Sequence, residues 1–192
     1  MNYELSIDNT PATIPAGTGL LLVHPSTGET DRIDTQFLKT DTDSMLVIST
    51  RTTAREVKQK LEHYEVDESN ATILDALSAE RGYTRRQSDR VRYLAAPDDF
   101  EGLISETERF LESTDGKRRI SLDSITEMIY YADESESRKA VDEILALLEK
   151  HDAVGLFHLA AGVHDDEVID QYRELFDGVI ELSEDGSVSA TL

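Results

Sequence analysis

GLLLVHPSTGET, residues 19–30, joins an apolar run to a short polar loop that contains Gly28. The uninterrupted run at 20–23 is typical of a strand buried on both faces, because it lacks the polar alternation of a strand with one wet face. A strand followed by such a loop is also where a nucleotide-binding domain carries G-x-x-x-x-G-K-[ST]. The stretch therefore indicates an α/β domain and marks a first candidate site.

Five further apolar runs repeat this strand pattern, at residues 45–49, 91–95, 119–123, 154–159 and 178–182. Apolar residues recur at helical spacing within 57–64, 100–111, 141–148 and 168–176. Two of these helices follow carboxylates that suit a helix start, Asp98-Asp99 after Pro97 and Asp165-Asp166. Because parallel strands need crossover connections, the alternation predicts a three-layer α/β fold with a mostly parallel sheet and helices on both faces.

The two ends of the chain depart from this alternation. Runs at 179–182 and 187–191 flank Ser183-Glu184-Asp185-Gly186, and the Asp-Gly pair predicts an antiparallel hairpin at the sheet edge. Residues 1–18 hold a strand-like run at 3–7 and an approach to the first core strand. A chain of 192 residues with 39% hydrophobic content suits one core. We expect a single domain, 1–192, in which segment 1–18 precedes a core of 19–192.

The charge balance limits the classes of partner. The chain has 19 Lys+Arg against 40 Asp+Glu, a formal charge of -21, which repels nucleic acid and anionic membranes. The excess is spread along a chain with few lysines, no Cys and no Trp, as in a protein of a salt-loving archaeon, where salt screens self-repulsion. With no membrane-spanning run and no amino-terminal signal, we expect a cytoplasmic protein with a protein partner.

The loop after the first core strand departs from a working phosphate loop. Such a loop uses glycine amides and a lysine to hold phosphate, and a Ser/Thr hydroxyl to hold magnesium. Gly28 and Thr30 fit, but Glu29 takes the lysine position and Val23 that of the first glycine. The reversed charge repels the γ-phosphate by at least about 1 kcal/mol even at high dielectric. We expect either an ordinary strand-to-helix turn or a vestigial nucleotide site formed by Ser26, Thr27, Gly28, Glu29 and Thr30.

A second candidate position lies at the end of the run at 119–123. Asp123 stands where a nucleotide-binding domain carries its magnesium-binding Asp, and Ser124 follows it. The alternative is that Asp123 or Ser124 caps the helix that contains Ile125 and Met128.

Taken in order, five segments resemble the KaiC/RecA-like P-loop ATPase superfamily, and within it a degenerate haloarchaeal branch without an intact Walker A motif. They are LLLVHPSTGET (20–30), SMLVISTRTTAREV (44–57), DRVRYLAAPDDFEGL (89–103), RRISLDSITEMIYYAD (118–133) and ELFDGVIELSEDG (174–186). The resemblance implies a RecA-like fold over nearly the whole chain. In active members a pair of glutamates ends the strand after the phosphate loop, and Arg51 and Thr52 take that position here. It therefore implies the fold without the catalysis.

Two other groups of residues carry weaker patterns. The histidines have no spacing typical of a metal site, so we expect none from His24, His63, His151, His158 and His164. We interpret Asp31 with Asp34, and Asp41 with Asp43, as solvated acidic loops, because no calcium-loop Gly and Glu follow them.

One segment opposes the global charge. Residues 81–92 contain five of the thirteen arginines, Arg81, Arg85, Arg86, Arg90 and Arg92. Guanidinium groups bind carboxylates and phosphates, so these arginines are candidates for docking an acidic partner, or they balance neighbouring acidic surface. With Tyr83 as its only aromatic residue, the segment lacks the stacking platform of a single-strand nucleic acid binder.

These patterns predict a non-catalytic, RecA-like regulatory or protein-interaction domain, with no cofactor beyond weak or vestigial ATP and magnesium. One alternative is a nucleotide sensor that binds without hydrolysis through Thr30, Asp123 and the amides near 26–28. Another is a transcription-linked adaptor that uses the arginines of 81–92. Loss of ATP chemistry favours a monomer or homodimer over a hexameric ring.

Overall fold

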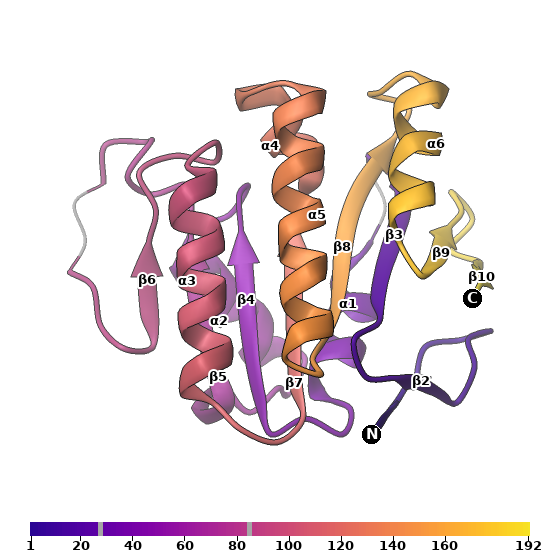
Figure 1. Cartoon of the computed structure of the whole chain (residues 1–192), viewed down its shortest axis with the longest axis horizontal. Coiled ribbons are helices and arrows are strands. Elements are labelled where there is room, and N and C mark those ends of the chain that lie inside the picture. The colour runs from indigo at the N-terminus through magenta and orange to yellow at the C-terminus, as the bar shows by residue number, and fades with distance from the viewer. Residues whose placement is uncertain (27–28, 84–85) are drawn as a thin grey trace.

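The central sheet of the computed structural model, which describes residues 1–26, 29–83 and 86–192, has eight strands in the order β10-β9-β3-β8-β7-β4-β5-β6 (Figure 1). Only β10 runs antiparallel to its neighbour. The strands are β3 (Gly19–Pro25), β4 (Ser44–Ser49), β5 (Ala71–Asp75), β6 (Val91–Tyr93), β7 (Arg118–Asp123), β8 (Val154–Ala161), β9 (Gly178–Leu182) and β10 (Val188–Thr191). A separate hairpin pairs β1 (Asn2–Glu4) with β2 (Thr13–Pro15).

Helices cover both faces of this sheet. In Figure 1, α3, α5 and α6 lie over the near face, while α1 and α2 lie behind it. The helices are α1 (Asp31–Lys39), α2 (Ala54–His63), α3 (Phe100–Ser113), α4 (Ile125–Tyr131), α5 (Glu134–Lys150) and α6 (Asp166–Leu175), with a 3-10 turn η1 (Glu68–Asn70). None of the helices formed by the described residues is both long and apolar enough to cross a membrane.

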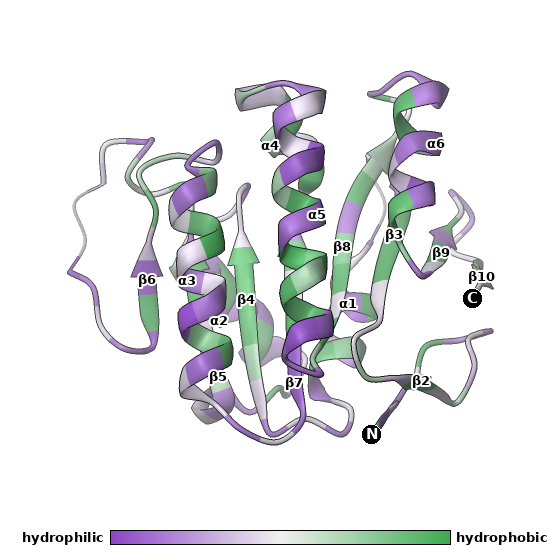
Figure 2. Cartoon of the chain, viewed as in Figure 1, coloured by the Kyte–Doolittle hydropathy of each residue, from purple (hydrophilic) through white to green (hydrophobic). Residues whose placement is uncertain are grey.

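The strands are uniformly apolar because each contributes to two cores. In β3, Leu21 and Val23 join the core under α3 to α6, whereas Leu20 and Leu22 join the core that contains α1, α2 and the amino-terminal hairpin. Figure 2 shows the hydrophobic colouring along the central strands. The predicted three-layer architecture and the antiparallel hairpin at the carboxyl end are confirmed.

Two elements of the three central layers escape the sequence pattern, as do β2 and η1, and two differ in length. The strand β5 is a five-residue run, and α1 contributes Ile33, Phe37 and Leu38 to the core within an otherwise polar segment. The strand expected at 3–7 ends at Glu4, since the chain turns where the amide of Thr10 bonds the carbonyl of Ile7 at 3.3 Å. The strand expected at 91–95 is the shorter β6.

The amino-terminal hairpin is held to the sheet by one buried tyrosine. The hydroxyl of Tyr3 donates to the carbonyl of Asp152 at 2.8 Å and accepts from the amide of Arg118 at 3.1 Å. The guanidinium carbon of Arg119 lies 5.3 Å from the centre of the Tyr3 ring and 4.9 Å from that of Phe37. Segment 1–18 therefore completes the core instead of forming a loose extension.

We expect Tyr3→Phe to lower the free energy of unfolding by about 1–3 kcal/mol, because the change leaves two part-buried backbone groups without their partner. Urea unfolding followed by circular dichroism measures the change. Tyr130→Phe removes the same hydroxyl from a side chain that is 83% exposed and should leave stability unchanged. Equal stability of both variants and the wild type would contradict this role of Tyr3.

Candidate functional site

The candidate site lies at the carboxyl ends of the central strands β3, β8, β7 and β4. In open α/β sheets, ligands bind outside these ends, where the strand order reverses. Here β8 lies between β3 and β7 in the sheet. The carboxyl ends of β3 and β7 therefore lie on either side of the carboxyl end of β8.

The deepest group in the site is the carboxylate of Asp34, which α1 places against the sheet with no exposed surface. One carboxylate oxygen of Asp34 lies 2.7 Å from Nε2 of His158 on β8 and accepts a hydrogen bond from the hydroxyl of Ser121 on β7. The other oxygen accepts a bond from Nζ of Lys60 on α2 at 3.0 Å. Four elements therefore converge on one buried carboxylate.

The sequence interpretation of Asp31 and Asp34 as a solvated loop is wrong. Both residues belong to α1, and Thr30 is its N-cap residue. Ile33 and Phe37 recur at the spacing of one helical turn and turn that side of the helix inward, which buries Asp34 beside them. Asp41 and Asp43 do lie outside helices and strands, as expected, where they bind Lys117 through its ammonium and its amide.

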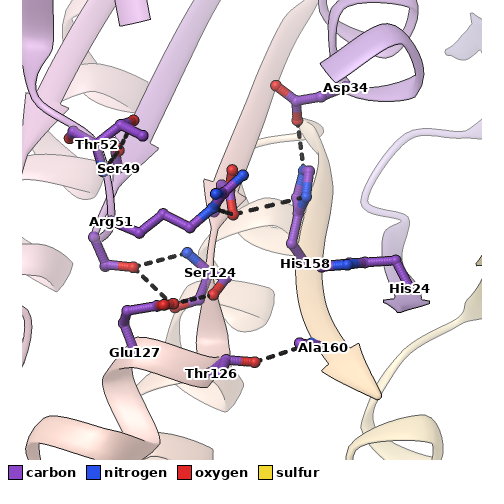
Figure 3. Close-up of polar contacts among 12 residues, drawn as sticks. His24, Asp34, Ser49, Arg51, Thr52, Ser124, Thr126, Glu127, His158 and Ala160 are labelled. Atoms are coloured by element: carbon purple, nitrogen blue, oxygen red, sulfur yellow. Dashed lines mark hydrogen bonds and ion pairs between the residues drawn. The ribbon is translucent and has the colours of Figure 1, made fainter. Parts of the chain in front are cut away.

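A second carboxylate, that of Asp123, is joined to the first through His158. Nε of Arg51 donates to Oδ1 of Asp123 at 2.8 Å, and Nδ1 of His158 lies 3.9 Å from the same oxygen. Figure 3 shows the side chains of Arg51 and Asp34 both directed toward His158. We call the resulting series of side chains the buried ion network: Lys60, Asp34, His158, Asp123 and Arg51.

The network shifts the pKa of each member toward its charged form. Burial lowers the pKa of His158, but Asp123 and Asp34 more than offset burial and raise it above the ordinary value. Burial alone would raise the pKa of Asp34 and of Asp123, yet their cationic partners hold both below the usual range. The pKa of Arg51 is raised, chiefly by its hydrogen bond to Asp123. Two carboxylates and three cations therefore share the site when His158 is protonated.

The loops that end β4 and β7 are tied to each other beside this network. The hydroxyl of Thr50 accepts from the amide of Ser124 at 2.7 Å and donates to its carbonyl at 3.0 Å. The hydroxyl of Ser124 donates to the carboxylate of Glu127. Ser124 is buried; its backbone bonds the residue after β4 and its side chain bonds the first turn of α4. These bonds hold Asp123 and Arg51 in position.

The loop expected to hold phosphate carries no cation in its described part. Ser26 and Glu29 are exposed, Thr30 is buried without a side-chain capping bond, and Thr27 and Gly28 lie outside the described residues. A pocket of about 750 Å³ next to Ser26 is lined by Asp166, Asp170, Glu181 and Glu184. Its cation, Arg173, already contacts Asp170 at 3.9 Å and Glu181. The surroundings of the loop are therefore unfavourable for a phosphate.

The five histidines do not converge on a shared site among the described residues. His158 belongs to the network, and His24 packs edge-on against it with ring centres 5.9 Å apart. Elsewhere, Glu108, Glu112 and His151 bring potential ligand atoms within 4.8 Å of one another, but Lys150 donates to Glu108 at 3.1 Å.

The arginines of 81–92 are divided among different tasks. Arg92 forms a two-point contact with Glu106 at 2.8 and 3.0 Å, and Arg90 donates to the carbonyl of Ser69. Arg81 lines a pocket, Arg86 is exposed, and Arg85 lies outside the described residues. Of the arginines that the structure describes in this segment, Arg90 and Arg92 therefore already have partners within the protein, and Arg81 and Arg86 are exposed.

Of the predicted site residues, the structure brings Asp123 and Arg51 into direct contact, and it adds Asp34, Lys60 and His158, which the sequence analysis missed. His158 had one detectable signal, because it interrupts the otherwise apolar strand VGLFHLAA. A buried polar side chain in such a strand requires a partner. Lys60 and Asp34 lie on amphipathic helices and carry no comparable local signal.

Comparison with known proteins agrees with this topology. A KaiC-like protein from the hyperthermophilic archaeon Pyrococcus horikoshii matches 93% of the chain and 78% of its own length, at 14% identity and TM-score 0.62. An uncharacterized protein from the same species, solved with an unknown peptide, gives 16% identity and TM-score 0.66 over 92% of the chain and 83% of its own. The chain spans about half (53%) of a prototypical type III secretion ATPase from pathogenic bacteria, and 90% of the chain is matched at 12% identity and TM-score 0.63.

These likenesses show the RecA/KaiC-like fold. No curated protein sequence matches the chain. A family model described as "Family of unknown function (DUF7090)" matches residues 1–192.

We expect Lys60→Met to lower the free energy of unfolding by about 3 kcal/mol, because it removes a cation from a buried carboxylate while retaining the length of the side chain. Lys58→Met on the same helix is the control, since Lys58 is exposed and makes no ion pair with any described residue. Chemical denaturation of both variants measures the difference. A loss no larger than that of the control would show that Asp34 does not depend on Lys60.

His158 should also make stability depend on pH. A raised folded pKa stabilises the fold below the unfolded value of 6.5, and this contribution is lost as pH rises through the folded pKa. We expect wild-type stability to fall over that interval relative to His158→Gln, which can still bond Asp34. The pKa of His24 is lowered by burial, with a smaller contribution from the charge of His158, and gives a slope of the opposite sign.

Denaturation at constant salt across that pH interval measures this difference, and the exposed His63→Gln should keep the wild-type slope. Parallel curves for the wild type and His158→Gln would contradict the coupling of His158 to the two carboxylates.

Proposed function

The chain belongs to the DUF7090 family of unknown function, and we propose that it uses its RecA/KaiC-like fold as a non-catalytic, pseudo-ATPase domain for regulation or protein interaction. The proposal depends on one observation, the ion pair between Arg51 and Asp123 at 2.8 Å. The same contact affects both the expected magnesium ligand and the position of the expected catalytic glutamate.

Asp123 is a poor magnesium ligand in this setting. Its side chain is only 9% exposed, and one oxygen already faces the guanidinium of Arg51 and the imidazole of His158. A magnesium ion would have to displace Arg51 and would stand beside a protonated His158, so like charges would oppose it. The two cations replace the double positive charge that the metal would bring.

At the position where the resemblance expects a water-activating glutamate, this chain has Arg51. A glutamate there would accept a proton from the attacking water, whereas the guanidinium of Arg51 remains charged and has no acceptor atom. Thr52 is engaged with the hydroxyl of Ser49 at 2.8 Å. Neither side chain is suited to serve as a general base.

The phosphate side of the site supports the same proposal. Glu29 stands at the position where the resemblance expects lysine, and four carboxylates line the neighbouring pocket against one arginine. Tight binding of ATP in the usual pose is therefore unfavourable, and we propose no nucleotide or metal cofactor for the domain.

A domain without ATP chemistry acts through its surfaces. A structural neighbour was solved with an unknown peptide bound, so this fold is compatible with a polypeptide partner. The charge of -21 disfavours nucleic acid and favours a partner that tolerates concentrated salt. We propose a cytoplasmic, salt-adapted monomer or homodimer, because ring assembly around ATP loses its purpose when ATP is not used.

A phosphate-release assay with ATP and magnesium in concentrated KCl tests the proposal. We expect the rate of the wild type to equal that of Asp123→Ala and of protein-free buffer. Magnesium-dependent turnover that Asp123→Ala abolishes would overturn the pseudo-ATPase assignment.

Calorimetric titration of the same samples distinguishes the nucleotide-sensing alternative. Saturable binding of ATP and magnesium that is lost in Thr30→Ala and Asp123→Ala, without phosphate release, would support a sensor at the end of β3. We expect no heat that depends on these two residues.

A further inference from the structure

A pocket at the opposite edge of the sheet concentrates cations in this acidic protein. It has a volume of about 810 Å³ and lies between the start of α2, the turn after β5 and the edge strand β6. Arg55, Lys58, Arg81, Tyr83 and Tyr93 are among its lining residues. Its volume lies within the roughly 300–1,000 Å³ that small-molecule sites occupy.

The cations of this pocket differ from eight others among the described residues. Those eight Lys and Arg side chains pair with carboxylates within 4.0 Å: Arg51, Lys60, Arg92, Arg109, Lys117, Lys139, Lys150 and Arg173. Arg55, Lys58 and Arg81 are exposed and make no ion pair or side-chain hydrogen bond with any described residue. Grouped around one pocket, these three side chains offer a place where an anion from outside can be paired.

The acidic residues of the pocket wall mostly turn toward the backbone. Asp75 is fully buried and accepts from the amides of Ala54, Leu77 and Ser78 at 2.8 Å each, and from the hydroxyl of Ser78. This carboxylate joins the start of α2 to the turn that leads to Arg81. The pocket therefore has a rigid wall before any ligand arrives, which reduces the ordering cost of binding.

The other two acids leave the cationic end open. The carboxylate of Glu56 accepts from the amide and hydroxyl of Thr53 in the capping box of α2. Glu62 lies about two helical turns beyond Arg55 along α2 and about one turn beyond Lys58, so it leaves the Arg55 end of the pocket open. The first turns of α2 thus present Arg55 and Lys58 at the positive end of the helix dipole, which adds to the attraction for an anion.

We propose that this pocket binds a small phosphorylated ligand that carries a planar ring, of the mononucleotide class. The cations from α2 and from the turn after β5 hold the phosphate, and the tyrosine rings give a flat surface for the ring. A small molecule fits better than a nucleic acid chain, because the site is a bounded pocket and the surrounding charge of -21 repels a polyanion. The site is separate from the β3 and β7 ends and does not depend on the proposed function.

Amide chemical shifts of the full chain, titrated without magnesium in KCl, test this proposal with three probes: adenosine monophosphate, adenosine and inorganic phosphate. We expect saturable shifts at 53–59, 78–81 and 91–93, with the monophosphate binding more tightly than either fragment. Absence of saturation at these amides with millimolar monophosphate would overturn the proposal, as would fragments that bind equally well.

Charge variants locate the phosphate. Arg55→Gln and Arg81→Gln should each weaken the monophosphate roughly tenfold, about the value of one charge-assisted hydrogen bond. Arg32→Gln is the matched control, since Arg32 is an exposed cation on α1 outside the pocket and makes no ion pair with any residue that the structure describes. Equal affinities of all three variants would overturn the assignment.

Ring recognition and ligand class have their own tests. Tyr83→Leu should abolish the advantage of the monophosphate over inorganic phosphate while leaving phosphate binding in place, and an unchanged advantage would overturn the role of the ring. A single-stranded oligonucleotide that binds these amides more tightly than the monophosphate would overturn the small-ligand proposal and assign the pocket to nucleic acid.

Discussion

The buried carboxylate of Asp34 is the constraint around which this face of the molecule is arranged. An unpaired ionised carboxylate in the protein interior costs several kcal/mol, so its partners must be present in the folded state. They come from three other elements: Lys60 from α2, Ser121 from β7 and His158 from β8. Placing β8 beside β7 and laying α1 and α2 on the same face brings all of them together. The strand order thus brings the partners of Asp34 together, and their contacts with Asp34 in turn stabilise that arrangement of strands and helices.

His158 links the buried carboxylate of Asp34 to Asp123 at the carboxyl end of β7. Its two ring nitrogens face different carboxylates, Asp34 at 2.7 Å and Asp123 at 3.9 Å. Arg51, whose side chain is partly exposed, pairs with Asp123 at the outer end of the network. Buried ion pairs often stabilise a fold no better than apolar residues would, so stability alone does not explain them. Under the proposed function their positions do, because an active ATPase of this fold would hold metal and phosphate there. In that proposal the compensating charge comes from the protein's own side chains.

The local parts of this structure could be predicted from sequence, and the long-range parts could not. Apolar runs identify β3, β4, β7, β8 and β9, since a strand buried on both faces has a distinctive composition. Asp123 was found because it ends such a strand, and Arg51 because the resemblance places the catalytic glutamate pair of active members at its position. Asp34 and His158 are separated by 124 positions, and no local pattern connects them. Asp34 lies in a polar segment that resembled a loop because it contains only three apolar residues, Ile33, Phe37 and Leu38.

Burial also divides the charges of this chain into two groups that respond differently to salt. The excess carboxylates at the surface repel one another, and ions screen that repulsion within a few ångströms at molar concentration. The network around Asp34 and His158 excludes water, so dissolved ions screen its pairs far less. Salt can therefore relieve the cost of a charge of -21 without weakening the pairs that hold α1 and α2 to the sheet. If exposed ion pairs held α1 and α2 to the sheet instead, the salt that screens the repulsion between the surface carboxylates would weaken those pairs as well.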